Sequence, residues 1–454
     1  MKTILLSSIL TVLVTSTASA QTLVGPAERL WQIGDSIDGE LVTFIREGSV
    51  DEMDNVASFI TANDEDSVII ATVDGVPTII IREGDAIPGG GFVESFSEHT
   101  GRLGDLVLYH GSRIDDDPTN RSGDEALLLQ DVNVSVPTVI ARTGVTLVPG
   151  RTVSFESIST TQGFGLGGGR VAFSASFVDG VDGRGVYLWE NGAMSTIADT
   201  DDSFGGLPFT RFDNAKPDEN GSGIVFDASR DDAGTSVRSV FVAEGGSLTE
   251  LISTGDPFPG SSGMISRVGR PDIDGGRVVV RLEGSAGEDG VFIVDTQGNT
   301  TLVADLNTPL PDSAGDTGPA TRFQDQVGIG GNLVFFRAAR PVAGLATWIW
   351  GNGTFEPVLP SGEILDGREV DEVSGNVERH SMSRNALVVE VLFDGSADGI
   401  YRIPLSQPVI DPPPVTPPPG PSSVQPVPLP GVAAVLAVLL LLFGGRALRA
   451  RQHA

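Results

Sequence analysis

A unit of four short apolar strands recurs seven times in this chain of 454 residues. Its most regular part is a first strand such as Val56-Ala-Ser-Phe59. The other six copies are Leu106–Tyr109, Val171–Phe173, Ile224–Phe226, Val278–Val280, Leu333–Phe335 and Leu387–Val389. Successive copies begin 50 to 55 residues apart, apart from one interval of 65. Since a repeat of this length cannot bury its apolar face alone, the units must pack on one another.

Two kinds of turn separate the strands. Between the second and third strands lie dipeptides that predict two-residue hairpins with positive φ. These are Asp74-Gly75, Asn191-Gly192, Gly245-Gly246, Gln297-Gly298 and Asn352-Gly353. Gly84-Asp-Ala-Ile-Pro-Gly89 is typical of the connection from the third strand to the fourth. We expect the apolar residue of this connection to point inward, and its Asp to be structural rather than catalytic.

The two ends of the repeat region are complementary. The region opens with a third strand (Leu30–Ile33) and a fourth (Leu41–Phe44), and it closes with a first (Leu387–Leu392) and a second (Gly399–Ile403). Joined, the half-units form one complete sheet and leave no open edge. We therefore predict an all-β fold, a seven-bladed β-propeller whose N- and C-terminal strands complete one shared blade. A pair of β-sandwiches and an open solenoid are alternatives, but neither explains the complementary ends.

The repeats resemble bacterial tandem repeats with the approximate signature Asn-x-x-Gly-x-x-Ala-Phe. The nearest matches are Gly169-Arg-Val-Ala-Phe173 and Asn220-Gly-Ser-Gly-Ile-Val-Phe226. The first has Leu166 in place of the Asn, and the second is one residue shorter than the signature. The resemblance covers most of the repeat region and implies no particular activity.

The N-terminus has the pattern of a secretory signal peptide. Lys2 is followed by an apolar stretch over 4–14 and by small residues at Ala18 and Ala20, which predict cleavage before Gln21. We therefore expect residues 1–20 to be removed and 21–405 to form the propeller. An uncleaved anchor is the alternative.

The C-terminus combines four parts in a fixed order. We expect a Pro-rich spacer over 406–430 that ends in Val427-Pro428-Leu429-Pro430, a short transmembrane helix over 431–445, and a basic cytoplasmic tip over 446–454. This order resembles the PEP-CTERM-type sorting tails of Gram-negative bacteria in their VPLP variant, although Gly431 follows the box where Ala is commoner.

That resemblance implies an exosortase-type membrane protease as a partner, which processes the tail near the VPLP box. A plain C-terminal membrane anchor is the alternative. Either way, we expect an exported protein at the cell surface or outside the cell. The C-terminal helix would anchor it in the inner membrane, transiently or permanently.

The composition limits the classes of molecule that the protein is expected to bind. The formal net charge is −31, which disfavours binding to nucleic acid or to anionic surfaces. Acidic residues collect in the loops between first and second strands, and the densest segment, 115–125, makes Asp115, Asp117 and Asp124 candidate Ca²⁺ ligands. A solvated acidic loop is the alternative. No other cofactor is predicted.

The sequence contains no recognisable active site. It has no cysteine and no Gly-x-Ser-x-Gly motif, and His99, His110 and His380 lack the spacing of zinc ligands. We interpret the protein as a non-enzymatic binding or structural module of the surface or matrix, with extracellular polysaccharide as its ligand. The alternative is a secreted polysaccharide-active glycoside hydrolase or lyase. Carboxyl groups with raised pKa values around the central channel would favour that alternative.

Overall fold

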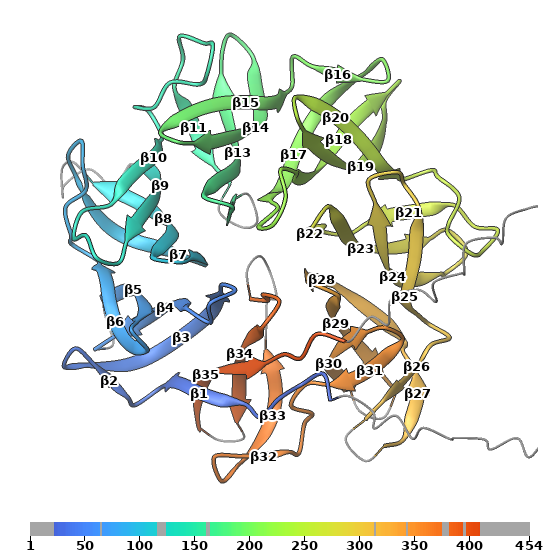
Figure 1. Ribbon diagram of the computed structural model, residues 1–454. Coiled ribbons are helices and arrows are strands. Elements are labelled where there is room, and N and C mark those ends of the chain that lie inside the picture. Colours follow the sequence, from blue (N-terminus) through green and yellow to red (C-terminus); the bar gives the residue numbers. More distant parts are fainter. Residues whose placement is uncertain are drawn as a thin grey trace, which may run out of the picture. The chain divides into compact units, whose positions relative to one another are not determined.

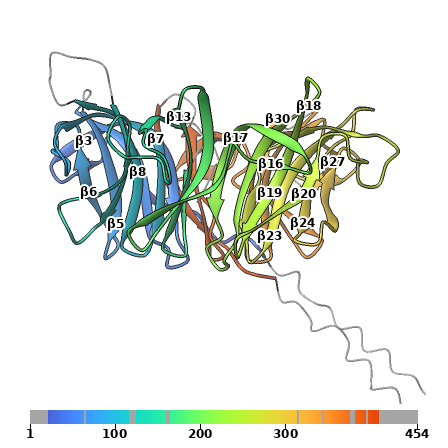
Figure 2. The same cartoon turned by 90° about the horizontal axis from the view of Figure 1, so that it is seen from above.

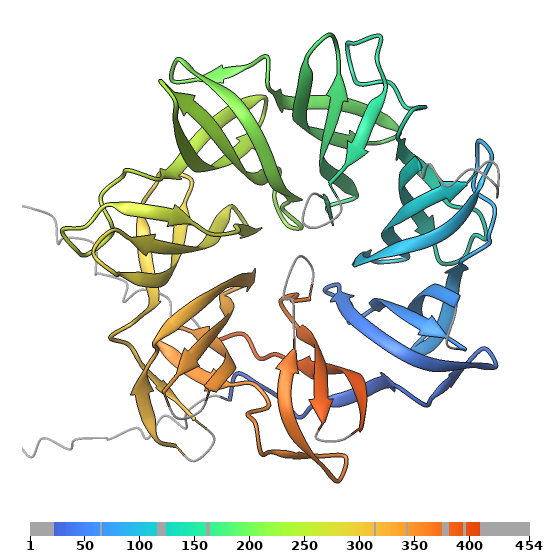
Figure 3. The same cartoon turned by 180° about the vertical axis from the view of Figure 1, so that it is seen from behind.

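The computed structural model describes residues 22–408 except 64–65, 116–123, 160–163, 313–314, 342–343, 375–380 and 394–395. Within this part of the chain every regular element is a strand. Seven sheets of four or five strands surround a central axis, as seen from the two sides of the ring in Figures 1 and 3. The side view in Figure 2 shows the sheets standing side by side in a flat disc. The predicted seven-bladed β-propeller is confirmed.

The blades follow one another in chain order. Blade 1 contains β2 (Ser36–Ile37), β3 (Glu40–Val50), β4 (Val56–Ala62), β5 (Asp66–Val73) and β6 (Val76–Arg82). Blade 2 contains β7 (Phe92–Leu103), β8 (Leu106–Asp115), β9 (Asp124–Asp131) and β10 (Thr138–Arg142). Blade 3 contains β11 (Phe155–Ile158), β12 (Phe164–Gly167), β13 (Arg170–Val178), β14 (Asp182–Glu190) and β15 (Ala193–Asp199). Blade 4 contains β16 (Ser203–Phe204), β17 (Leu207–Pro217), β18 (Ile224–Asp232), β19 (Thr235–Glu244) and β20 (Ser247–Ser253).

The remaining blades complete the ring. Blade 5 contains β21 (Ile265–Val268), β22 (Asp272–Asp274), β23 (Arg277–Gly284), β24 (Asp289–Asp295) and β25 (Thr300–Asp305). A small hairpin of β26 (Pro309–Pro311) and β27 (Thr317–Pro319) leads to blade 6, which contains β28 (Arg322–Gly330), β29 (Leu333–Arg340), β30 (Gly344–Gly351) and β31 (Thr354–Pro357). Blade 7 contains β32 (Ile364–Leu365), β33 (Arg368–Ser374), β34 (Ala386–Phe393) and β35 (Ser396–Pro404), joined by β1 (Glu28–Gln32) from the other end of the chain.

The two ends of the chain share blade 7. β1 pairs antiparallel with β35, with Glu28 opposite Arg402 and Gln32 opposite Gly399. The blade therefore takes three long strands from the C-terminal side and one from the N-terminal side. The predicted division into two halves was wrong, because Leu41–Phe44 belongs to β3 and pairs with β4 of blade 1. The short Gly-Asp turn before it looks like a hairpin within a blade, yet it carries the chain from one blade to the next.

Seven hydrophobic clusters fill the spaces between blades. Successive residues of a strand point to opposite faces of its sheet, so the run Val278–Val280 serves two clusters at once. Val278 and Val280 pack with blade 4, whereas Val279 packs with blade 6. The shared blade is sealed in the same way, since Trp31 of β1 is fully buried against blade 1. Because both faces of each sheet are buried, the strands are almost continuously apolar.

The hairpin turns agree with the sequence in four of five cases. At Asp74-Gly75, Asn191-Gly192, Gly245-Gly246 and Asn352-Gly353 both residues have positive φ. At Gln297-Gly298 only the glycine does. There the Asp295 carboxylate accepts hydrogen bonds from the backbone N–H groups of Gln297 and Asn299, and a longer turn results.

The connections between blades have the expected structural role. Their apolar residue is buried, as expected, at Ile37, Ile87, Val148, Phe258 and Leu310, whereas Ile364 in the connection over 362–367 is exposed. Their Asp accepts a hydrogen bond from the backbone N–H three residues earlier. This contact joins Asp35 to Gln32 at 2.9 Å, Asp85 to Arg82 at 2.8 Å and Asp256 to Ser253 at 2.7 Å. An Asp engaged in this way fixes the turn.

Candidate functional site

The innermost strands carry bulges that redirect side chains towards the central channel. β17, β22 and β28 lie close to the axis of the ring (Figure 1). In β17 the register shifts between Phe209 and Arg211, and again between Asp213 and Lys216. β28 shifts between Phe323 and Val327. Bulges are common beside functional sites because they re-aim a side chain without breaking the sheet.

A polar cavity of about 170 Å³ is lined mainly by residues of β17, β19, β21 and β28. Its wall includes four arginines, Arg211, Arg238, Arg267 and Arg270, and two aspartates, Asp213 and Asp325. We call this cavity the arginine pocket. Ser159, at the end of β11, completes the polar lining.

The pocket draws on four consecutive blades. Ser159 belongs to blade 3, Arg211 to blade 4, Arg267 to blade 5 and Asp325 to blade 6. Because blades diverge away from the axis of a propeller, residues of four successive blades meet only at its centre. The arginine pocket is therefore part of the wall of the central channel.

Ion pairs hold the arginines in place. Arg211 Nε lies 2.6 Å from Asp213, and Arg238 Nη2 lies 2.7 Å from Asp227, a buried residue behind the pocket. Arg267 contacts Asp325 directly and lies 3.1 Å from Glu283.

Asp325 is also shared with the neighbouring Arg281 at 2.8 Å. The pocket lining therefore holds four guanidinium groups and two carboxylates, and Asp227 and Glu283 beside it supply two further negative charges. Carboxylates thus largely compensate the charge of the arginines.

The electrostatics of the pocket are dominated by burial. Burial lowers the pKa of Arg270, and the positive charges of Arg238 and Arg267 lower it further, while Asp325 and Asp227 oppose the change. Burial also raises the pKa of Asp227 against the effect of Arg238. An anion that enters the site would stabilise the charged form of buried arginines of this kind.

A second polar cluster crosses the channel towards its other end. The Asn220 side-chain amide donates to Glu52 at 2.8 Å and to Asp274 at 2.7 Å. Arg384 lies 3.2 Å from Glu52 and 3.3 Å from Asp274. These residues come from the inner turns of blades 4, 1, 5 and 7, so two of the contacts, Asn220 with Glu52 and Arg384 with Asp274, join blades that are not neighbours. We call this cluster the channel network.

A lysine and two carboxyl groups lie beside the channel network. Lys216 forms a buried ion pair with Asp272. Glu219 is half-buried, and burial raises its pKa to about 8, with Asp272 and Asp274 adding to the effect and Lys216 opposing it. A carboxyl group with a raised pKa near the channel is the feature that we expected of the enzyme alternative.

The buried His110 lies elsewhere, between blades 2 and 3. Its ring stacks on Phe164 with centroids 6.3 Å apart. Neither ring nitrogen has a hydrogen-bond partner among the described residues. Burial lowers the pKa of His110 to about 3, and His99 contributes to this shift. A neutral, enclosed imidazole of this kind is part of the core and not of a site.

The predicted calcium site lies largely outside the described residues. Asp117 is not described, and of Asp115 only the backbone is. Asp124 lies 3.3 Å from the buried Arg142, on the wall of an open pocket of about 740 Å³. In the part of the chain that is described, no three His, Cys, Asp or Glu side chains are grouped as metal ligands.

The predicted processing residues also fall outside the described part of the chain. These are Ala18 and Ala20 at the signal cleavage site and Val427, Pro428, Leu429 and Pro430 in the sorting box. The expected transmembrane helix over 431–445 lies outside it too. Between residues 22 and 408, with the gaps given above, no helix has the length and apolar character of a membrane span.

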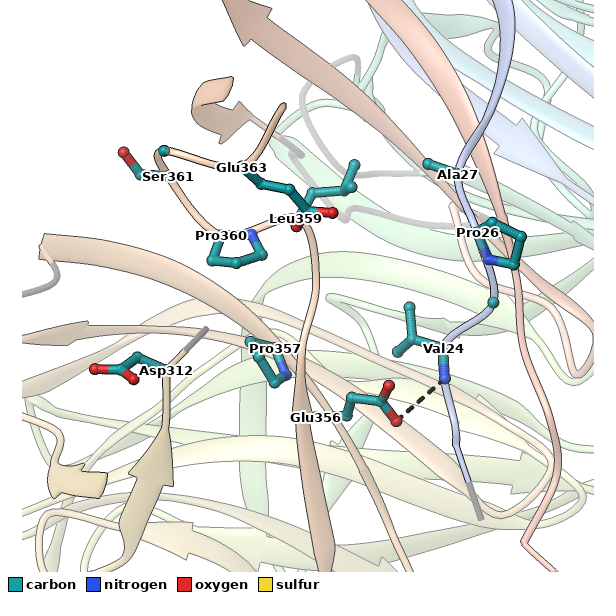
Figure 4. Close-up of a pocket in the computed structure, with 12 residues that line it drawn as sticks. Val24, Pro26, Ala27, Asp312, Glu356, Pro357, Leu359, Pro360, Ser361 and Glu363 are labelled. Carbon is teal, nitrogen blue, oxygen red and sulfur yellow. Dashed lines mark hydrogen bonds between the residues drawn. The ribbon is translucent and has the colours of Figure 1, made fainter. Parts of the chain in front are cut away.

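A peripheral pocket of about 720 Å³ lies beside the closure of the ring (Figure 4). Its wall includes Pro357, Pro360 and Glu356 on one segment, Pro26 on the N-terminal segment, and Asp312 on a third (Figure 4). The Glu356 carboxylate accepts hydrogen bonds from the backbone N–H groups of Leu23 and Val24. Because this contact holds the N-terminal segment in place, we assign the pocket a structural role.

Sequence analysis did not identify the arginine pocket. Arg267 and Arg270 form an Arg-x-x-Arg pair directly after a blade-to-blade turn, and this was the one local signal available. Arg211, Arg238 and Asp325 join them only through the ring. The channel network was equally hidden, because Glu52 and Arg384 are separated by most of the chain.

Comparison with family models assigns the chain to a family, whereas comparison with solved structures supports only the fold. A family model described as "Family of unknown function (DUF7453)" matches residues 41–362. No curated protein matches the chain in sequence.

Several solved structures share the general architecture. The β-propeller domain of the Trilobed protease from Pyrococcus furiosus is 10% identical with a TM-score of 0.44, over 69% of this chain and 83% of that one. An oligogalacturonate lyase in complex with manganese is 10% identical with a TM-score of 0.47, over 85% and 99%. The oligogalacturonate lyase of Vibrio parahaemolyticus is 10% identical with a TM-score of 0.44, over 84% and 93%.

Proposed function

This chain belongs to the Family of unknown function (DUF7453), and we propose that it is an exported β-propeller that binds extracellular polysaccharide through its central channel. The observation that carries the proposal is the arginine pocket, a polar cavity on the channel wall to which four blades contribute. Sugar polymers are recognised by hydrogen bonds from fixed polar groups in concave sites. Here ion pairs orient the guanidinium groups before any ligand arrives.

The ends of the chain supply the cellular context of the proposal. We propose that the signal peptide is cleaved after Ala20 and that the protein passes to the surface or matrix. An exosortase-type protease would act on the Val427-Pro428-Leu429-Pro430 box, and the helix over 431–445 would anchor the protein until then. Bound Ca²⁺ at Asp115, Asp117 and Asp124 remains part of the proposal, since Asp124 lies near the chain segment that carries the other two.

A glycan array tests the proposed function. The purified protein is applied to immobilised polysaccharides with Ca²⁺ and, separately, with a chelator. We expect binding to a subset of the polymers and no turnover of any. Absence of binding to every polymer under both conditions would contradict the proposal, and loss of binding with the chelator would implicate the calcium segment.

One observation favours a second candidate, a polysaccharide hydrolase or lyase. Glu219, with a pKa of about 8, lies near Lys216 and Asp272 beside the channel. A carboxyl group that stays protonated at neutral pH can act as a general acid. Incubation with each bound polymer, followed by assay of reducing ends and of unsaturated products, decides between the two. Turnover that is lost in Glu219→Gln would establish the enzyme, whereas intact polymers would establish the binding module.

A further inference from the structure

We propose that the arginine pocket recognises an anionic group, so that the ligand is an acidic polysaccharide bearing carboxylates or sulfates. This inference rests on the proposed function and specifies the class of polymer. The density of guanidinium groups is its first support. The lining presents four of them, in a protein whose formal net charge is −31. The ion pairs of Arg211 and Arg267 engage only some of the five N–H donors of each group, so an anion can bind as a further acceptor.

The choice of residue is the second support. All four cations of the pocket are arginines. The planar guanidinium matches a carboxylate or a sulfate with two parallel hydrogen bonds, whereas an ammonium group acts as a point charge.

Exposure divides the arginines into two pairs. The side chains of Arg211 and Arg267 are 58% and 49% exposed, so they are accessible from the channel. Arg238 is 34% exposed and is held from behind by the buried Asp227. Arg270 lies deeper in the wall, where its guanidinium group loses hydration and has Asp325 and Asp227 as oppositely charged neighbours and Arg238 and Arg267 as like-charged ones. An anion bridging Arg211 and Arg267 would accept charge-assisted hydrogen bonds from both exposed guanidinium groups.

The size of the cavity limits what enters it. A volume of about 170 Å³ holds a carboxylate or sulfate with part of the sugar ring that carries it, and not a stretch of polymer. The rest of the chain would extend along the channel mouth. We therefore expect recognition of one acidic residue at a time, with the neighbouring sugars contributing less.

The experiment compares acidic and neutral polymers on the wild-type protein and on three variants. Arg211→Gln with Arg267→Gln removes two exposed charges without opening the core. Arg184→Gln is the matched control, because Arg184 is exposed on β14 outside the pocket. Affinity is measured by calorimetry with a uronate polymer, a sulfated polymer, a neutral polymer, and glucuronate and sulfate as free ions.

We expect the acidic polymers to bind and the neutral polymer not to bind. The double variant should bind at least about tenfold more weakly, and Arg184→Gln should match the wild type. Raising NaCl from 50 to 500 mM should weaken binding about tenfold. The variant Arg211→Lys with Arg267→Lys should recover only part of the affinity, because lysine restores charge and not the paired hydrogen bonds.

The results that would contradict the anionic specificity differ from those that would contradict the proposed function. Equal binding of neutral and acidic polymers, or acidic binding that survives in the double variant, would overturn the anionic specificity and leave the proposed function standing. Binding of glucuronate or sulfate at the pocket without any polymer would overturn the proposed function and leave the anion site. Absence of binding by every probe would overturn both.

Discussion

Two ionisable groups with strongly shifted pKa values serve different purposes in this molecule. His110 is enclosed in the core between blades 2 and 3, whereas Glu219 lies beside the channel. Burial suppresses the charged form of each group, and it does so whether the site is structural or functional. What separates the two is the surroundings, because Glu219 lies among Lys216, Asp272 and Asp274, whereas His110 stacks on Phe164 and has His99 as an electrostatic neighbour.

His110 predicts a loss of stability in acid. Its pKa in the folded protein is about 3, below the ordinary value of 6.5, so below pH 6.5 the unfolded chain binds a proton that the folded protein rejects. Stability from this residue is present above pH 6.5 and is lost as the pH falls towards 3. Between pH 6.5 and pH 4.5 the free energy of unfolding of the wild type should decrease. In His110→Phe this decrease should be smaller by about 1–2 kcal/mol. Chemical denaturation at the two pH values measures this difference, and equal losses in both proteins would contradict it.

Glu219 predicts the opposite trend in alkali. Its folded pKa of about 8 lies above the ordinary value of 4.5, so the folded protein keeps a proton that the unfolded chain has released. The folded state is therefore destabilised progressively as the pH rises from 4.5 to 8. Glu219→Gln should be more stable than the wild type at pH 9 by about 1–2 kcal/mol, with little difference at pH 4.5. Thermal unfolding at both pH values tests this, and a variant that is less stable at pH 9 would refute the assignment.

At the scale of the element, carboxylates of the inner turns join successive blades. The buried Asp218, in the turn after β17, accepts hydrogen bonds from the backbone N–H groups of Gly275 at 3.0 Å and Gly276 at 2.7 Å in blade 5. Asp274 in turn accepts from Gly331 of blade 6 at 2.6 Å. Asp51 makes the same contact with Gly104 of blade 2 at 2.6 Å. The inner turns are thus pinned to one another around the channel.

Removing one of these carboxylates should weaken the ring. Asp218→Ala leaves the N–H groups of Gly275 and Gly276 without an acceptor, and we expect a loss of about 2–3 kcal/mol in the free energy of unfolding. Asp232→Ala is the control, because Asp232 is exposed at the far end of β18. Urea titration of both variants gives the measurement. A cost for Asp218→Ala no larger than that of the control would show that the contact does not stabilise the ring.

The sequence predicts those elements whose determinants are local. Asn191-Gly192 and Asn352-Gly353 form the expected turns because residues with positive φ are required there. Gln297-Gly298 does not, because the side chain of Asp295 competes for the turn's N–H groups. The apolar run Val278–Val280 similarly predicts a strand that is buried on both faces.

The candidate site could not be predicted in this way. Arg211, Arg267 and Asp325 become neighbours only when blades 4, 5 and 6 stand around one axis. Their positions further depend on register irregularities in β17, β21 and β28, which shift side chains by one or two register positions without a sequence signature. Contacts that depend on ring geometry and bulges therefore cannot be predicted from local sequence patterns. The same holds for the channel network.

For the whole molecule, ring closure determines where every other feature lies. β1 completes blade 7 by pairing with β35, and Trp31 is buried against blade 1. Arg402 also forms an ion pair with Glu28 across this junction. If the ring did not close, blades 1 and 7 would lose their shared core, and Glu52 and Arg384 would not meet at the junction of these two blades.

A paired cysteine substitution tests ring closure most directly, because the natural chain contains no cysteine. Glu28→Cys with Arg402→Cys places two thiols at opposed positions of β1 and β35. Glu28→Cys with Arg184→Cys is the control. The account predicts that mild oxidation of the first variant consumes both thiols in an intramolecular disulfide and raises the melting temperature, while the control keeps its thiols free. Free thiols and an unchanged melting temperature in the first variant would contradict the closed ring.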